Sequence, residues 1–476
     1  MLLSMAQTFF FYDLETSGLN ARDDRIMQFA GQRTDRQLNP IGEPYNLLVA
    51  LSDDTLPSPD ALMVTGISPQ KTLDEGYTEA QFAKILHEDI FTEDTIAVGF
   101  NNVRFDDEFV RHLFWRNFYD PYTWTWRDGR SRWDLLDVVR MTRALRPDGI
   151  EWPVDSEGRP TNRLELITKA NGVSHDKAHD ALSDVEALID VAMLIKQKQP
   201  QLFEYLLSMR DKKSVQKLVN LDQKQPFVYV SGRYDNEWNK ATIAFPLTSA
   251  PNGNIVVYDL RYDPTPFLKL SEAELAAKLF ASWDERHAEG FVKLPTKVLQ
   301  YNRCPAVAPL GVLGVAGGWQ RIGLSIELIE KNVKKLLSDE SFAERVRSVF
   351  ESRPEYKKAT DPEGRLYDSF VPNEDRIRIE AVRNADTNKL ADFNPDFIDE
   401  RLPELLLHYK ARSYPRSLSQ AELERWESWR ADRLNQQFES TVKSFARLEK
   451  VNLTDDQRFT LSELKLWIEG VMPESI

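Results

Sequence analysis

The chain has 476 residues, a formal net charge of −14 and 42% hydrophobic residues. At roughly 150 residues per domain, this length predicts about three domains, each able to bury an ordinary core. No apolar run approaches the ~18 residues of a membrane span, so we expect no contact with a membrane. The first residues lack the basic stretch and cleavage site of a signal peptide, although Met5 offers an alternative start. Cys304 is the only cysteine, which excludes an intrachain disulfide and indicates a reducing cytoplasm.

The acidic net charge argues against a polyanionic partner, because like charges repel at long range. Charge is local, however, and the segment 196–224 carries seven lysines and arginines against three acids. Arg140, Arg143 and Arg146 recur at a spacing that places them near one face of a helix. Solvated helix faces are the commonest reason for such clusters, so they indicate a nucleic-acid surface only weakly.

Residues 1–198 alternate short runs of strand-forming residues with amphipathic segments, which is typical of an α/β fold around a central sheet. The last amphipathic segment carries apolar residues at helical spacing from Leu182 to Ile195, which we interpret as core. The expected strands cover 8–14, 26–32, 45–51 and 95–100, and the expected helices cover 106–118, 164–170 and 178–198.

The middle of the chain changes to β structure, and the last part is helical. Asn252-Gly253 between two strand-like runs predicts a hairpin, and a capped helix over 272–287 interrupts the strands. This pattern predicts a small β-barrel with an insertion, whose strands cover 227–230, 241–247, 255–260 and 291–300. A capping box at Ser419–Glu422 opens a long helix, and another helix begins at Thr454. The predicted domain boundaries are 1–198, 199–352 and 355–476.

Asp13 and Glu15 occupy alternate positions of the first predicted strand. The period of two places both carboxylates on the same face, where they can share a cation. Acids at the end of a buried strand are costly unless they are paired or bind a metal. The tripeptide is common, however, and two acids facing solvent are an equally good reading of this pair alone.

Three further residues complete the pattern: Asp106 at a predicted helix start, then His179 and Asp184, five residues apart. By itself Asp106 favours a helix N-cap, a role that Asp107 fills equally well. Histidine suits a general base because its pKa lies near working pH. His175 and Asp180 are local competitors for the roles of His179 and Asp184.

Four carboxylates and one histidine, scattered over 184 residues beside apolar runs, predict a two-metal site for phosphoryl transfer. Two divalent cations about 4 Å apart clamp the attacking and leaving oxygens of an in-line displacement. Only hard oxygen ligands hold Mg²⁺ or Mn²⁺ in this way. The sequence therefore predicts an enzyme that cuts phosphodiester bonds.

The order of these motifs resembles the DEDDh 3′→5′ exonucleases of the DnaQ-like superfamily. The shared pattern is D-x-E on an early strand, N-x-x-x-F-D at a helix start, then H-x₄-D. Longer segments, such as NNVRFDDEFVRHLFWRNFYDPYTW and RLELITKANGVSHDKAHDALSDVEALI, are similar to the bacterial exonuclease I family. This resemblance implies an RNase H-like exonuclease domain with a mixed sheet, an SH3-like β-barrel and a C-terminal helical domain.

The resemblance also implies roles for the residues. Asp13, Glu15, Asp106 and Asp184 are expected to hold two Mg²⁺ ions, which Mn²⁺ replaces, and His179 to take a proton from the attacking water. The expected reaction is processive 3′→5′ hydrolysis of single-stranded DNA to nucleoside 5′-monophosphates, by a cytoplasmic monomer in repair and recombination. We expect substrate contacts from Thr16, Ser17, Trp124 and Trp126, and docking of the acidic tail of single-stranded DNA-binding protein at Arg146 and Arg321.

Three other functions remain to be compared with this one. The same chemistry on RNA is typical of shorter chains with a lone exonuclease domain. A proofreading subunit of a polymerase does not need the large C-terminal half. A catalytically inactive scaffold predicts the loss of an acid or of the histidine, and all five residues are present.

Overall fold

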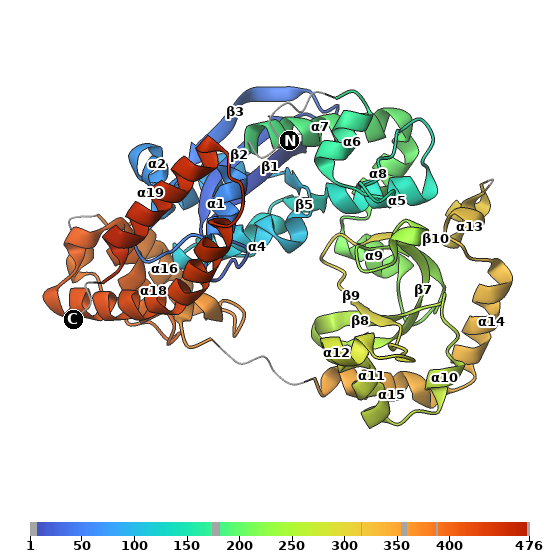
Figure 1. The fold of residues 1–476 in the computed structure, drawn as a ribbon. Coiled ribbons are helices and arrows are strands. Elements are labelled where there is room, and N and C mark those ends of the chain that lie inside the picture. Colours follow the sequence, from blue (N-terminus) through green and yellow to red (C-terminus); the bar gives the residue numbers. More distant parts are fainter. Residues whose placement is uncertain (1–6, 174–180, 316, 354–358, 387–388, 474–476) are drawn as a thin grey trace, which may run out of the picture. The chain divides into compact units, whose positions relative to one another are not determined.

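The computed structural model describes residues 7–173, 181–315, 317–353, 359–386 and 389–473 (Figure 1). No helix in these ranges is both long enough and apolar enough to cross a membrane. The chain forms two compact units, and the C-terminal segment belongs to the same unit as the N-terminal one. The first unit comprises Met1–Arg132, His175–Ile189 and Lys357–Ile476, and the second comprises Trp133–Ser174 and Asp190–Tyr356.

A mixed sheet forms the centre of the first unit, as predicted. Its strand order is β3-β2-β1-β4-β5, in which β1 pairs antiparallel with β2 and parallel with β4. The residues Phe9 to Tyr12 of β1 are fully buried, so this strand lies inside the unit. The strands are β1 (Thr8–Thr16), β2 (Ile26–Thr34), β3 (Pro40–Leu48), β4 (Thr95–Gly99) and β5 (Ser131–Asp134).

Helices from both ends of the chain build the rest of the first unit. In Figure 1, α19 runs beside α1 and α2, although almost 400 residues separate them in sequence. Leu434, Leu464 and Trp467 share one hydrophobic cluster with Met27 and Leu62. The helices are α1 (Pro59–Thr65), α2 (Pro69–Glu75), α3 (Glu79–Ile85), α4 (Asp106–Arg116), the start of α7 (Ala181–Lys198), α16 (Asn373–Arg383), α17 (Leu402–Ser413), α18 (Gln420–Leu448) and α19 (Asp455–Val471).

The second unit is built on an antiparallel sheet with strand order β10-β6-β7-β8-β9. The predicted hairpin is confirmed, and Asn252 and Gly253 in its turn both have positive φ, at 60° and 69°. The single helix predicted over 272–287 is wrong: Ser282 forms a second capping box and divides it into α11 (Glu272–Phe280) and α12 (Trp283–His287). The strands are β6 (Phe227–Val230), β7 (Ala241–Ala250), β8 (Asn254–Asp259), β9 (Thr296–Leu299) and β10 (Ala306–Pro309).

The remaining helices of the second unit lie before and after its strands in sequence, except α10, which lies between β8 and β9. The predicted helix at 164–170 is confirmed with the same bounds. The ring of Phe342, on α15, lies 6.5 Å from that of Tyr258 on β8. These helices are α5 (Leu135–Leu145), α6 (Leu164–Ala170), α8 (Pro200–Ser208), α9 (Lys212–Leu218), α10 (Thr265–Leu268), α13 (Gly318–Arg321), α14 (Ile326–Leu337) and α15 (Glu340–Glu351).

A buried network of ion pairs joins the two ends of the chain inside the first unit. Arg25, which is 1% exposed, lies 3.2 Å from Asp54 and 3.0 Å from Glu363. Arg412 lies 2.9 Å from Asp54 and 2.5 Å from Glu363. His408 shares Glu363 through a contact of 2.8 Å from its Nδ1. Each acid therefore has guanidinium groups from both ends of the chain beside it.

The charges of this network depend on one another. Burial alone would raise the pKa of Glu363, but Arg412, Arg25 and His408 hold the pKa well below its usual value. Burial likewise opposes the charge of Asp54, and Arg412, Arg25 and Arg433 lower its pKa. Because both folded-state pKa values lie below the unfolded value of about 4, the network stabilises the fold above that pH. This contribution is lost as pH falls through the folded-state values.

We expect Arg412→Ala to lower the free energy of unfolding by about 3–5 kcal/mol, because it leaves two buried carboxylates short of a partner. Urea unfolding of the full chain, followed by tryptophan fluorescence, measures this loss. The control is Arg447→Ala, which removes a half-exposed ion pair with Asp60 between the same two segments. That variant should lose less than about 1 kcal/mol. Equal losses from both variants would contradict the role of burial.

Candidate active site

Three of the predicted acids meet in the first unit. Oxygen atoms of Asp13, Glu15 and Asp184 all lie within 4.8 Å of one another. Asp13 and Glu15 are on the same side of β1 near its C-terminal end, and Asp184 is in the first turn of α7. The strand period and the helix start thus bring together acids that are about 170 residues apart in sequence.

The environment of Asp13 opposes a negative charge. Burial and the neighbouring charge of Asp184 raise the pKa of Asp13 to about 8, and the backbone N–H of Leu14 lowers it only in part. A divalent cation among these oxygens would reverse this balance, because it favours the ionised carboxylates. Three carboxylates are the hard oxygen ligands that such cations prefer. The residues therefore fit a divalent metal ion.

A second group of acids has a different environment. Asp361, Glu363 and His408 also lie within 4.8 Å of one another. Here, however, Arg25 and Arg412 bind the two oxygens of Glu363. The guanidinium groups already supply the positive charge, so this group belongs to the ion-pair network and we assign no metal to it.

Asp106 is the first residue of α4 and is 4% exposed. It does not belong to the group of three acids, but its charge contributes to the raised pKa of Tyr12, the residue before Asp13. Its competitor Asp107 is fully buried and accepts hydrogen bonds from the Tyr12 hydroxyl (2.6 Å) and from Arg132 (2.5 Å). Asp107 therefore supports the fold, which leaves Asp106 as the metal-ligand candidate of this helix.

His179 lies outside the described residues, together with its competitors His175 and Asp180. Its role stays a prediction from the sequence. Asp184, which follows this segment, does reach the acids of β1.

Thr16 and Ser17 follow the acids but use their hydroxyl groups internally. The hydroxyl of Thr16 donates to the carbonyl of Gly18 at 2.7 Å. Ser17 is fully buried, and its Oγ accepts from the backbone N–H of Arg25 at 2.9 Å. Their side chains shape the turn after β1, and a contact with substrate stays a prediction.

Trp124 and Trp126 do not lie beside the acids. The segment that follows them is held at the start of β1, where Gln7 donates to the carbonyl of Gly129 at 3.1 Å. The acids lie at the other end of this strand, about 20 Å away at ~3.3 Å per residue. Trp124 is also 3% exposed and packs 4.5 Å from Phe91 in the core, so its ring is not available to a base. Trp124 is buried because it belongs to the hydrophobic cluster that also contains Phe91 and Phe114. Trp126, at 65% exposed, keeps an accessible ring.

Arg146 and Arg321 lie together in the second unit. Both guanidinium groups donate to the carbonyl of Leu145, at 2.8 Å from Arg146 and 3.2 Å from Arg321. Burial and the charge of Arg321 lower the pKa of Arg146. Two like charges at one place form a local positive patch on an acidic chain.

Sequence reasoning missed a hydrogen-bonded group that contains the sequence neighbours of Asp13 and Asp106. Asn102 donates to Asp107 at 3.1 Å, beside the Tyr12 and Arg132 contacts, and all four residues are buried. This group ties β1 to the start of α4 and so fixes Asp106 relative to Asp13. The available signal was that Asn102 and Asp107 directly follow Asn101 and Asp106, the first and last residues of the N-x-x-x-F-D motif.

Comparison with known proteins gives three family matches along the chain. The family described as Exonuclease matches residues 10–192, the Exonuclease I SH3-like domain matches 210–352, and the Exonuclease I C-terminal domain matches 360–471. The RNase H-like, SH3-like and helical parts expected from the resemblance are therefore confirmed as a fold class.

Similar proteins cover almost the whole chain. Exodeoxyribonuclease I of Haemophilus influenzae is 38% identical over 456 residues, covering 95% of this chain and 96% of that protein. A crystal structure of E. coli exonuclease I in complex with a dA16 oligonucleotide has a TM-score of 0.93 at 35% identity, covering 98% of this chain and 100% of that one. The zinc-bound form of an E. coli exonuclease I–single-stranded DNA complex has a TM-score of 0.92 at 35% identity, covering 98% and 99%. The chain belongs to the exodeoxyribonuclease I family of nucleases.

Proposed function

We propose that this protein removes nucleotides from the 3′ end of single-stranded DNA and releases nucleoside 5′-monophosphates. The observation that carries the proposal is the group of Asp13, Glu15 and Asp184, whose oxygens lie within 4.8 Å. The E. coli relative was crystallised with single-stranded oligonucleotides, which supports DNA as the substrate. Processive action in DNA repair and recombination, by a cytoplasmic monomer with domains at 1–198, 199–352 and 355–476, is part of the same proposal.

The proposed cofactor is a pair of Mg²⁺ ions, which Mn²⁺ can replace. Asp13, Glu15, Asp106 and Asp184 would hold them. When bound, such ions supply the positive charge that stabilises the attacking and leaving oxygens of phosphodiester hydrolysis. The zinc-bound form of the E. coli complex supports a site for divalent metals in this family. His179 would accept the proton of the attacking water. Asp106, at the start of α4, would be one of the metal ligands.

We also propose that Arg146 and Arg321 bind the acidic tail of single-stranded DNA-binding protein. Paired guanidinium groups favour carboxylates, which they bind through charge-assisted hydrogen bonds. Both arginines donate to the carbonyl of Leu145, which supports a patch held in a fixed position.

Asp13→Ala should abolish digestion of a 5′-labelled single-stranded DNA oligomer in Mg²⁺, because a metal ligand is lost. The unchanged protein should shorten this oligomer from its 3′ end and spare both an RNA twin and a blunt duplex. EDTA should stop it. The matched control is Asp74→Ala, an exposed acid of α2, which should digest at the normal rate. Near-normal digestion by Asp13→Ala would overturn the site, and preferred digestion of RNA would move the protein to a ribonuclease function.

His179→Ala should lower the turnover rate about 10²–10⁴-fold, as expected for the loss of a general base. Single-turnover digestion at several pH values measures the loss and shows whether a group titrating near neutral pH disappears. The control is His175→Ala, its neighbour in sequence, which should keep its rate. A normal rate for His179→Ala and a loss for His175→Ala would exchange the two roles.

Arg146→Glu and Arg321→Glu should each weaken binding of an acidic tail peptide at least tenfold, because each replaces an attraction by a repulsion. Fluorescence anisotropy with a labelled peptide at two salt concentrations measures this change. Digestion of naked DNA should stay normal in both variants. Unchanged peptide affinity would remove these arginines from the partner site.

A further inference from the structure

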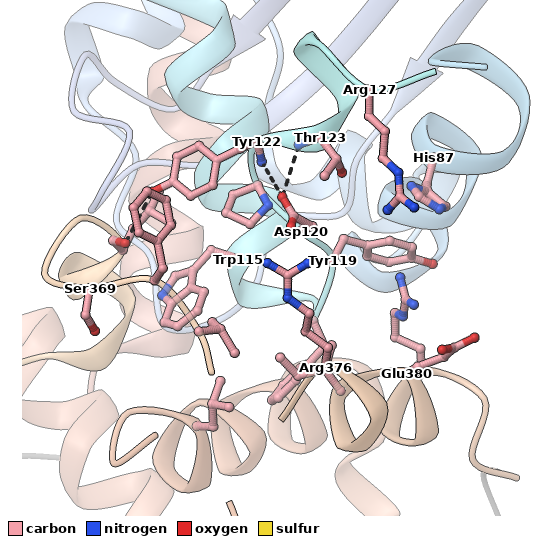
Figure 2. Close-up of a pocket in the computed structure, with 18 residues that line it drawn as sticks. His87, Trp115, Tyr119, Asp120, Tyr122, Thr123, Arg127, Ser369, Arg376 and Glu380 are labelled. Carbon is pink, nitrogen blue, oxygen red and sulfur yellow. Dashed lines mark hydrogen bonds between the residues drawn. The ribbon is translucent and has the colours of Figure 1, made fainter. Parts of the chain in front are cut away.

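The first unit contains a cavity of about 280 Å³ that lies away from the acids. Its wall is formed by the loop after α4, by α16 and by the segment before α16 (Figure 2). Trp115 lines it, nine residues after Asp106 on α4, which is about 14 Å at 1.5 Å per residue. The cavity is therefore separate from the proposed catalytic site.

One face of α16 supplies two arginines and a glutamate to this cavity. Arg376, Glu380 and Arg383 recur at helical spacing, so all three face the same way. Figure 2 shows Arg376 reaching from α16 toward Asp120 on the opposite wall, with Arg127 at the rim beside His87. The structure records no ion pair for Arg376 or Arg383 with any described residue.

Two acids also line the cavity, Asp120 and Glu380. The carboxylate of Asp120 accepts the backbone N–H groups of Tyr122 and Thr123, at 2.8 and 3.0 Å. Glu380 is exposed at the rim. Arg127 pairs with Asp128 at 3.6 Å, so the guanidinium groups left for a ligand are those of Arg376 and Arg383. Burial together with Arg383 lowers the pKa of His87.

Flat apolar side chains supply the rest of the cavity wall. Phe370 is 81% exposed, and its ring lies 5.8 Å from that of Tyr122. Arg383 lies 4.4 Å over the ring of Tyr119, which holds this guanidinium in place. An exposed aromatic ring that lines the same cavity as a held guanidinium suits a ligand with a planar body and an anionic group.

We propose that this cavity binds a nucleotide unit, with the base against Phe370 and the phosphate at Arg376 and Arg383. Guanidinium groups bind phosphate oxygens through two hydrogen bonds at once, and bases stack on aromatic rings. The volume lies near the lower end of the range for small-molecule sites, which suits one nucleotide and no more. The choice of a nucleotide rests on the proposed function, since either its substrate strand or its 5′-monophosphate product supplies one.

The test is calorimetric titration of the full chain with dAMP, deoxyadenosine, inorganic phosphate and a dT oligomer. EDTA is present throughout, so no digestion occurs and failure of the proposed nuclease function does not affect the result. The variant Arg376→Gln/Arg383→Gln should lose at least tenfold in affinity for dAMP, and Phe370→Ala should lose affinity for dAMP but not for phosphate. The control is Arg378→Gln on the same helix, which pairs with Asp375 and does not line the cavity.

The two sources of the nucleotide give different results. A loss for dAMP identifies a site for free mononucleotide, whereas a tenfold loss for the oligomer alone identifies a contact with the strand. Thermal unfolding of the variants should match that of the unchanged protein, because all three substituted side chains line an accessible cavity. If the double variant bound dAMP and the dT oligomer as tightly as Arg378→Gln does, the proposal would be overturned.

Discussion

A carboxylate removed from water needs a positive charge beside it, and this requirement governs both groups of acids in the first unit. In the ion-pair network, Arg25 and Arg412 meet Asp54 and Glu363, so the protein supplies the charge itself. Two of the network's contacts, Arg25–Glu363 and Arg412–Asp54, join residues more than 300 positions apart. They therefore hold the C-terminal segment on the sheet that carries Asp13 and Glu15, and the two ends of the chain form one compact unit.

The balance between burial and neighbouring charge is different at the acids of β1. The pKa of Asp13 is raised to about 8 by burial and by Asp184, whereas the pKa of Glu363 is held far below normal by guanidinium groups. Acids such as Asp13, whose pKa is raised, gain most from binding a divalent cation. The neighbouring group of Tyr12, Asp107 and Arg132 is already satisfied and fixes the start of α4. Adjacent residues thus divide two roles: Asp107 supports the fold, and Asp106 is the proposed metal ligand.

Local patterns allowed much of this structure to be predicted from the sequence. The strand at 227–230, the helix at 164–170 and the hairpin at Asn252-Gly253 follow from residue type and period alone. The order of the acid motifs predicted that Asp13, Glu15 and Asp184 meet. The break at Ser282 had a readable signal, a second Ser-x-x-Glu capping box, which the apolar periodicity on either side concealed.

Contacts between distant residues could not be predicted in this way. Trp124 and Trp126 are alike in sequence, yet tertiary packing buries the first and exposes the second. Arg25 and Glu363 carry no local mark of their pairing, because each resembles an ordinary surface charge.

The most direct test of the account is anomalous diffraction from crystals of this protein soaked in Mn²⁺. The account predicts anomalous peaks beside Asp13, Glu15 and Asp184, and none beside Asp361, Glu363 and His408, where arginines already supply the charge. Peaks at the second group, or no peak at the first group while the protein digests single-stranded DNA in the same Mn²⁺, would contradict it.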